Sequence, residues 1–140
     1  MYEVTPEMRN NLSDFAAGYA TEAEVKETIA EVYRKTGYVM DTHTAVAAHV
    51  CKSYREENED DRKAVIASTA SPYKFARSVM TSIDEKYDEL EEFALIDELE
   101  KISCVAIPNA IEEIRNAEIR HTGECDADKM EAAVKDILNI

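Results

Sequence analysis

The residues best suited to chemistry lie between positions 64 and 75, where an apolar run ends in small hydroxyl residues and a Ser-Pro helix start. The end of a buried strand and the start of a helix both direct free backbone N–H groups toward one point, and the helix dipole favours negative charge there. Ser68, Thr69 and Ser71 add neutral hydroxyls, and Lys74 adds a cation within the first helical turn. This arrangement predicts a site for a phosphorylated or otherwise anionic small molecule.

A second group of polar residues opens an earlier helix. Asp41 or Thr42 is the predicted N-cap of a helix that runs to about Glu57, and His43 lies in its first turn. The small side chains of residues 45–48 permit close packing against a sheet or a ligand.

The composition limits the classes of function. A chain of 140 residues with 45% hydrophobic and 33% charged residues fits one globular domain that buries a core without disulfides or metal. The formal net charge of −14 repels phosphate backbones and anionic lipids, so we expect neither nucleic acid nor a membrane surface as a partner.

The sequence pattern indicates neither a targeting signal nor paired cysteines. No window approaches the about 20 apolar residues of a membrane span, and the N-terminus lacks a signal-peptide pattern. Cys51, Cys104 and Cys125 are odd in number and widely separated, which suits neither a disulfide framework nor a zinc site. Reduced, mostly buried thiols in a cytoplasmic protein are therefore expected.

Helix signals recur along the whole chain. Helices are predicted from Thr5 to before Gly18, from Thr21 to Gly37, from Asp41 to about Glu57, from Ser71 to about Ser82, from Tyr87 to Lys101, after Pro108 and after Asp126. Residues 63–68 form the clearest strand, because their apolar run is too continuous for a half-exposed edge and is typical of a buried parallel strand.

These elements predict a helix-rich α/β fold with one firm buried strand and one or two short partner strands. The candidates for partners are Tyr2–Val4 and Tyr38–Met40. A lone buried strand cannot satisfy its own backbone N–H and C=O groups. Either the chain makes a small sheet from these marginal strands, or the neighbouring strands belong to other polypeptide.

Two segments together resemble a known family. They are Gly37-Tyr38-Val39-Met40-Asp41-Thr42-His43-Thr44-Ala45-Val46-Ala47 and Ala67-Ser68-Thr69-Ala70-Ser71-Pro72-Tyr73-Lys74-Phe75. Both are similar to the C-terminal portion of threonine synthase, a pyridoxal-phosphate enzyme of the tryptophan synthase β (fold type II) group. In that family Asp-x-His-Thr-Ala opens a helix, and a Thr-Ala-x-Pro-x-Lys-Phe turn follows the next strand. Thr42 departs from the proline that many members have, while Asp41 and Thr44 are kept.

The resemblance implies a function and a set of site residues. Threonine synthase converts O-phosphohomoserine and water to threonine and phosphate, with the cofactor acting as an electron sink. By resemblance, Thr69 matches the hydroxyl that hydrogen-bonds the pyridine nitrogen of the cofactor. Lys74, Asp41 and His43 are the candidates for substrate binding, with Lys74 attracting a phosphate group.

The resemblance also implies parts that are missing here. The family's Schiff-base lysine and Gly-rich phosphate loop have no counterpart, because Gly18, Gly37 and Gly123 do not cluster and no lysine has a matching context. We therefore expect residues 1–140 to be a single C-terminal segment of threonine synthase that contains no catalytic residue and no metal site. Its partner would be the remainder of the enzyme, and exposed apolar surface could also lead to self-association.

Other interpretations of the same residues remain open. The chain could be a free-standing acidic helical binding module in which Thr69 only caps a turn, Asp41 only caps a helix and Lys74 is a surface lysine. A dehydratase of the same cofactor group fits the paired motifs less well. The acidic run 84–92 lacks the spacing of a calcium loop and is interpreted as a solvated helix face.

Overall fold

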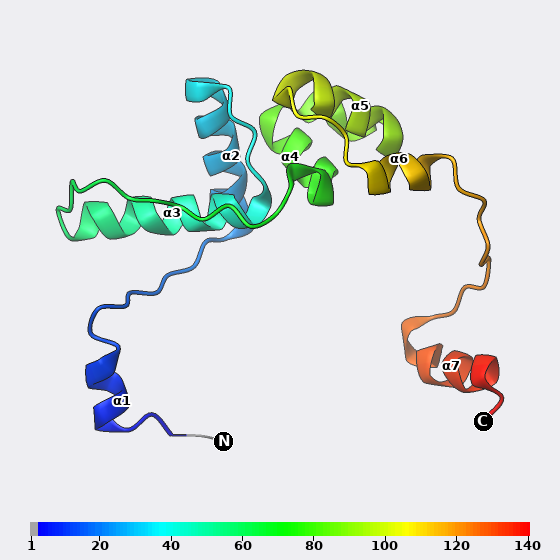
Figure 1. Ribbon diagram of the computed structural model, residues 1–140, viewed down its shortest axis with the longest axis horizontal. Coiled ribbons are helices and arrows are strands. Elements are labelled where there is room, and N and C mark those ends of the chain that lie inside the picture. Colours follow the sequence, from blue (N-terminus) through cyan, green and yellow to red (C-terminus); the bar gives the residue numbers. More distant parts are fainter. Residues whose placement is uncertain (1–2) are drawn as a thin grey trace. The chain divides into compact units, whose positions relative to one another are not determined.

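The computed structural model describes residues 3–140 as helices joined by loops (Figure 1). The α-helices are α1 (Pro6–Asn11), α2 (Glu22–Thr36), α3 (Thr42–Glu57), α4 (Ala76–Ile83), α5 (Glu92–Ser103), α6 (Asn109–Arg115) and α7 (Met130–Leu138). Three short 3₁₀ helices accompany them: η1 (Pro72–Phe75), η2 (Glu85–Glu89) and η3 (Ala127–Lys129). The chain divides into two compact units, one ending at Pro108 and the other comprising Asn109–Ile140.

Local hydrogen bonds explain where the central helices begin and end. The Thr21 hydroxyl accepts from the Glu24 N–H at 3.3 Å, and the Glu24 carboxylate accepts from the Thr21 N–H at 2.7 Å, which confirms the predicted capping box of α2. Gly37 ends α2 with φ of 73°, a left-handed conformation that costs glycine little. Asp41 is the N-cap of α3, as predicted.

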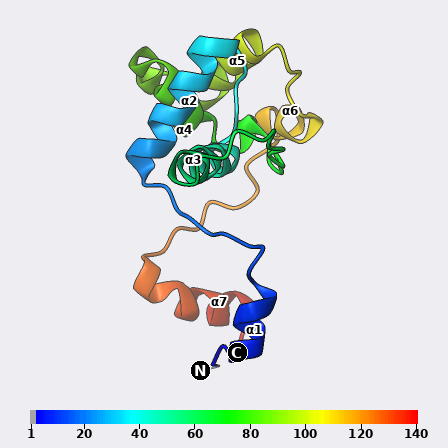
Figure 2. The same cartoon turned by 90° about the vertical axis from the view of Figure 1, so that its left-hand side faces the viewer.

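The core of the first unit lies between α2, the start of α3, α4, η2 and α5. α2 packs against α3 and α4, and α4 packs against η1, η2 and α5, an arrangement visible in Figure 2. The buried hydrophobic side chains are Ile29, Val39, Met40, Ala45, Tyr73, Ala76, Val79, Met80, Tyr87, Leu95, Ile96 and Leu99. Burial of each large side chain contributes about 1.5–3 kcal/mol relative to exposure.

Two polar contacts fasten the outer parts of this unit. The guanidinium of Arg77 donates to the Glu92 carboxylate and to the carbonyl oxygens of Asp88 and Leu90, all at 2.7–2.8 Å, and so joins α4 to η2 and α5. The Tyr73 hydroxyl donates to the carbonyl oxygen of Val105, beyond the end of α5. Burial raises the pKa of Tyr73, which keeps it a neutral donor.

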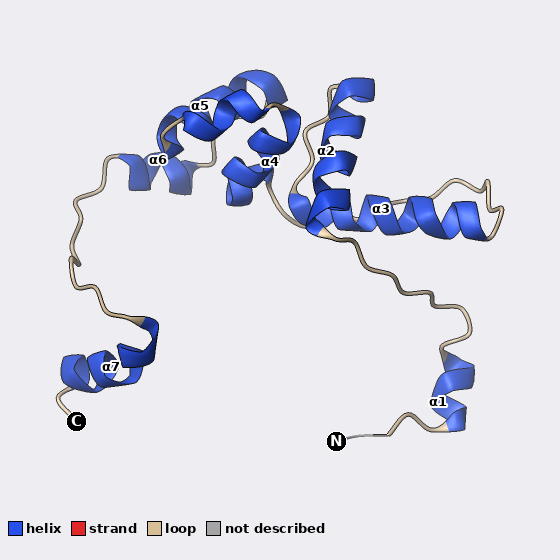
Figure 3. Cartoon of the chain, turned by 180° about the vertical axis from the view of Figure 1, so that it is seen from behind, coloured by secondary structure: helices blue, strands red, loops and turns tan. Residues whose placement is uncertain are grey.

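The predicted α/β fold is wrong, because no strand occurs in residues 3–140 (Figure 3). Residues 63–69 have no regular secondary structure, and they pair with no neighbouring strand in the described part of the chain. They are exposed rather than buried, and the side chain of Val65 is 97% exposed. The apolar run favours a strand, but a strand is completed only by a partner that supplies the other half of its hydrogen-bond ladder.

The proposed partner strands are not formed either. Residues 38–40 are an irregular link between α2 and α3, in which Val39 and Met40 are buried in the helical core. Of Tyr2–Val4, Tyr2 lies outside the described residues, and Glu3 and Val4 have no regular structure. Hydrophobic burial against helices therefore replaces the expected sheet.

The second unit contains α6, η3 and α7, none of which has a buried residue. Apolar side chains of α7 at helical spacing, Met130, Val134, Ile137 and Leu138, are 52–77% exposed. The expectation of mostly buried thiols is wrong: Cys104 and Cys125 are exposed, although all three cysteines are free as predicted. Within residues 3–140, no helix combines the length and apolar character needed to cross a membrane.

Candidate functional site

A chain of hydrogen bonds joins the two sequence motifs. The Asp41 carboxylate, 1% exposed, accepts from the N–H groups of His43 at 2.9 Å and Thr44 at 3.2 Å, and its second oxygen accepts from the Thr44 hydroxyl. The Thr44 oxygen lies 2.9 Å from the hydroxyl oxygen of Ser68. The first turn of α3 is thereby tied to the end of the extended segment.

The electrostatics of Asp41 follow from this arrangement. Burial alone would raise the pKa of this carboxyl, but the Thr44 hydroxyl, the two backbone N–H groups and the nearby His43 outweigh burial and lower it. Asp41 therefore stays ionised at neutral pH. Both of its oxygens are occupied by donors of its own helix, so its geometry suits a positioning role.

His43 and Lys74 lie around one aromatic ring. The centroid of the Phe75 ring is 5.4 Å from the His43 imidazole centroid and 5.4 Å from the Lys74 Nζ. Two of the three predicted substrate-binding residues are therefore next to Phe75, His43 from α3 and Lys74 from η1. Each is exposed.

His43 also lines a hollow of about 390 Å³ between the starts of α2 and α3 and the outer face of α4. Its lining is Ala20, Glu22, Val25, Lys26, Thr42, His43, Val46, Ser78 and Ser82. The lining combines the hydroxyls of Thr42, Ser78 and Ser82 with one amine, from Lys26, and one carboxylate, from Glu22, which suits a small polar ligand. Sequence reasoning missed Lys26, Ser78 and Ser82, because no local motif connects them to the Asp41 region.

Thr69 follows directly on Ser68 and precedes η1, whose N-cap is Ser71. Its side chain is exposed. Successive side chains of an extended segment point to opposite faces, so Thr69 shares a face with the exposed Val65, while Ser68 is directed toward α3.

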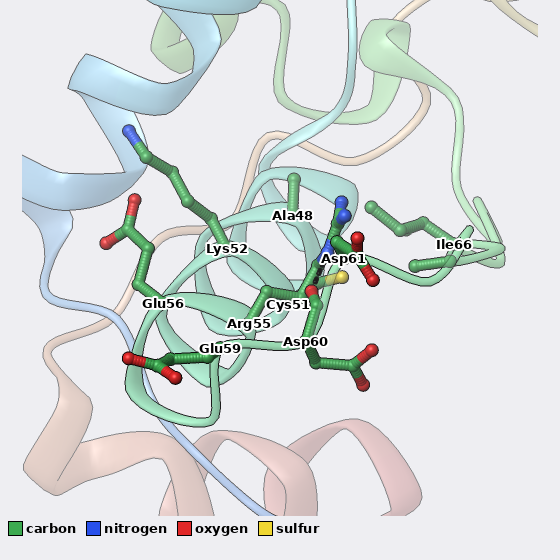
Figure 4. A pocket seen from close by; sticks show the side chains of 10 residues that line it. Ala48, Cys51, Lys52, Arg55, Glu56, Glu59, Asp60, Asp61 and Ile66 are labelled. Carbon is green, nitrogen blue, oxygen red and sulfur yellow. Dashed lines mark hydrogen bonds between the residues drawn. The ribbon is translucent and has the colours of Figure 1, made fainter.

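A larger groove of about 660 Å³ lies along the C-terminal part of α3 and contains none of the predicted site residues. Figure 4 shows Ala48, Cys51 and Arg55 of α3 on one side of this groove and Ile66 on the other, while the Lys52 side chain extends away from Ile66. The Arg55 Nε donates to the Asp60 carbonyl oxygen at 2.8 Å, which closes the turn after α3. This groove is large because the segment beside α3 is not covered by other elements. Its size therefore does not indicate a ligand site.

No metal site is recognisable in the part of the chain that the structure describes, where no three His, Cys, Asp or Glu side chains gather suitably. The polar groups around the bend are instead hydroxyls, one buried carboxylate and single cations. Such groups bind small polar ligands by hydrogen bonding and charge.

Comparison with known proteins shows the family of the chain. A family model described as the C-terminal part of threonine synthase matches residues 44–121, more than half of the chain. The chain belongs to the threonine synthase family. The matched range contains Thr44, Ser68, Thr69 and Lys74, and begins just after Asp41 and His43.

Individual relatives agree with the family match. Threonine synthase of Corynebacterium glutamicum is 35% identical over 82 residues, which are 59% of this chain and 17% of that protein. The proteins named threonine synthase-like 1 of Mus musculus and Homo sapiens are each 34% identical over 73 residues, 52% of this chain and 9% of theirs. The matched region thus spans less than a fifth of these relatives.

Family membership favours the enzyme hypothesis over a free-standing binding module. Of the four residues predicted for the site, His43 and Lys74 lie next to the Phe75 ring, and Asp41 is buried at the N-cap of the helix that contains His43. Thr69 is the next residue after Ser68, the last member of the hydrogen-bond chain. Their roles toward cofactor and substrate stay predictions.

Proposed function

We propose that this chain is the C-terminal part of a threonine synthase that converts O-phosphohomoserine and water to threonine and phosphate with pyridoxal phosphate. The observation that carries the proposal is the contact between Thr44 and Ser68, which joins the two sequence motifs in space. The segment alone would be inactive, since it has neither a Gly-rich loop nor a lysine in the required context.

The residues at the bend fit one side of the proposed cofactor. When bound, pyridoxal phosphate supplies an electron sink, and the protein supplies binding, orientation and electrostatics. The exposed hydroxyl of Thr69 is a neutral donor suited to a pyridine nitrogen. The backbone of this chain does not fit the cofactor phosphate, because its three glycines are far apart in sequence and form no phosphate loop.

Substrate binding would use the groups around Phe75. Lys74 supplies a positive charge that attracts the phosphate of O-phosphohomoserine, and His43 supplies a ring nitrogen beside it. Asp41 would act from beneath by holding the first turn of α3 in place. Water is excluded at this position only if further polypeptide covers the exposed bend.

That polypeptide would be the remainder of the enzyme, docked on residues 63–69. Ala64 and Ile66 line the groove along α3, and Ser68 bonds to Thr44, so one face of this segment is directed toward a helix of its own chain. The other face, with Val65, is open. Its unpaired backbone groups and apolar side chains suit insertion between strands of a sheet.

The test is a chimera in which residues 44–121 replace the matching segment of the Corynebacterium glutamicum enzyme. We expect the chimera to bind pyridoxal phosphate, seen by its absorbance, and to release phosphate from O-phosphohomoserine. Thr69→Val should change the cofactor spectrum and lower turnover at least tenfold, the effect of about 1.4 kcal/mol in barrier height.

Thr81→Val is the matched control, because the Thr81 hydroxyl bonds to the Arg77 carbonyl oxygen of its own helix. A chimera whose spectrum and turnover are unchanged by Thr69→Val would contradict the role of Thr69. Docking is tested by Val65→Asp, which should leave the melting temperature of the isolated chain unchanged and destabilise the chimera.

A further inference from the structure

The hydrogen-bond chain between Ser68 and Asp41 has a defined direction. An ionised carboxylate only accepts hydrogen bonds, so the single hydroxyl proton of Thr44 is committed to Asp41. The Thr44 oxygen can then take part in the 2.9 Å contact with Ser68 only as the acceptor. The Ser68 hydroxyl is therefore the donor.

We propose that Thr44 is a positioning residue that holds the bend at residues 68 and 69, and that Asp41 sets the direction of its hydroxyl. Thr44 is 6% exposed and belongs to a rigid helix start, whereas Ser68 lies in a segment without regular structure. Fixing Ser68 against α3 turns the next side chain, Thr69, to the opposite face. The inference rests on the proposed function, because the orientation of the Thr69 side chain matters for activity if its hydroxyl contacts the cofactor.

The direction also determines what Ser68 can bind. With its proton given to Thr44, the Ser68 oxygen offers only lone pairs to a ligand. It accepts from an N–H or ammonium group and repels a phosphate oxygen. The Ser68 oxygen therefore favours the ammonium group of an amino-acid phosphate over its phosphate group. The phosphate would bind to a cation such as Lys74.

The tether is tested in the isolated chain by backbone ¹⁵N relaxation, with no cofactor present. Thr44→Val should lower the heteronuclear NOE of residues 67–69 to the level of Lys63, and Thr44→Ser, which restores a hydroxyl, should recover the parent values. Thr81→Val is the control for losing a threonine hydroxyl inside a helix. Ser68→Ala changes an exposed residue, cannot unfold the core, and should reproduce Thr44→Val.

The direction is tested with Asp41→Asn, which keeps a good N-cap but can place an amide donor against Thr44. In the parent chain the Thr44 hydroxyl proton should exchange slowly with water and show an NMR signal. Asp41→Asn should change the chemical shift of that signal, while the heteronuclear NOE of residues 67–69 should stay at the parent values. Asp84→Asn, at an exposed cap, should leave it in place.

Two results would overturn the inference. One is a heteronuclear NOE at residues 67–69 that is equal in the parent, Thr44→Val and Ser68→Ala chains. The other is a Thr44 hydroxyl proton that exchanges rapidly or ignores Asp41→Asn. Neither result depends on pyridoxal phosphate, so failure of the tether and failure of the proposed cofactor role of Thr69 are distinguishable.

Discussion

The imidazole of His43 and the phenyl ring of Phe75 lie with their centroids 5.4 Å apart and their planes inclined by 38°. One ring comes from the first turn of α3 and the other from η1, so the two sequence motifs contact each other through these rings as well as through the Thr44–Ser68 contact. Tilted aromatic pairs at this separation attract each other beyond the area they bury.

A double-mutant cycle should detect this contact. His43→Ala and Phe75→Ala together should destabilise the chain by about 0.5–1 kcal/mol less than the sum of the single changes, because each single change already breaks the pair. Urea unfolding followed by circular dichroism measures the free energies. The matched control pairs His43→Ala with Phe15→Ala, whose ring is 75% exposed, and additivity is expected there. If the free-energy effects of His43→Ala and Phe75→Ala add fully, the contact between the two rings contributes nothing to stability.

The stabilising effect of Asp41 should disappear in acid. The pKa of its carboxyl is lower in the folded chain than the ordinary value of 3.8, so its contribution is present above that value and is lost as the pH falls through the folded pKa. Asp41→Asn should therefore be less stable than the parent at pH about 6, with the difference shrinking below about pH 4.

The comparison with Asp41→Asn isolates this carboxyl from others. The pKa of Asp60 is also lowered, to about 2, by hydrogen bonds from Arg62, and that contribution is the same in both chains. Thermal melts between pH 2 and 7, at intervals of about one pH unit, provide the difference curve. A stability difference that does not change across this range would contradict an ionised, hydrogen-bonded Asp41.

Arg77 should be a more important cation for the stability of the first unit than Arg62. Its guanidinium donates to Glu92 and to two backbone carbonyls, so Arg77→Ala should cost about 1–3 kcal/mol. Arg77→Lys should recover only part of this, because an ammonium cannot reproduce the planar fork. Arg62, which pairs with nearby Asp60 at the surface, is the control, and Arg62→Ala should cost less than about 1 kcal/mol. Equal losses of unfolding free energy for Arg77→Ala and Arg62→Ala would refute the role of Arg77 in joining α4 to η2 and α5.

Gly18 should tolerate no side chain. A Cβ at this position would lie 2.8 Å from Cγ1 of Val50, a stiff branched side chain on α3. Gly18→Ala should therefore destabilise the chain by about 1 kcal/mol or more, measured by chemical denaturation, and Val50→Ala in the same chain should relieve the added cost. Gly123→Ala, where a Cβ meets nothing within 4 Å, should be neutral. The close approach would be disproved by a neutral Gly18→Ala.

Helix starts and the family could be predicted from the sequence because they depend on neighbours in the chain. The Thr21–Glu24 capping box and the Asp41 cap close hydrogen bonds over two or three residues, so the local sequence contains both partners. The paired motifs identified the family in the same way, and the match over residues 44–121 confirmed it. The long acidic helix was placed less accurately: α5 begins at Glu92, after η2, rather than at Tyr87.

The state of residues 63–69 was decided only by the tertiary structure. Their apolar sequence predicted a buried strand, but burial and a hydrogen-bond ladder require neighbours, and residues 3–140 provide a helix on one face and no strand at either edge. The contact between Thr44 and Ser68 joins residues 24 positions apart, beyond the reach of any local pattern. Local hydrogen bonding is encoded in adjacent residues, whereas a strand or a tethered bend depends on which distant groups the fold brings beside it.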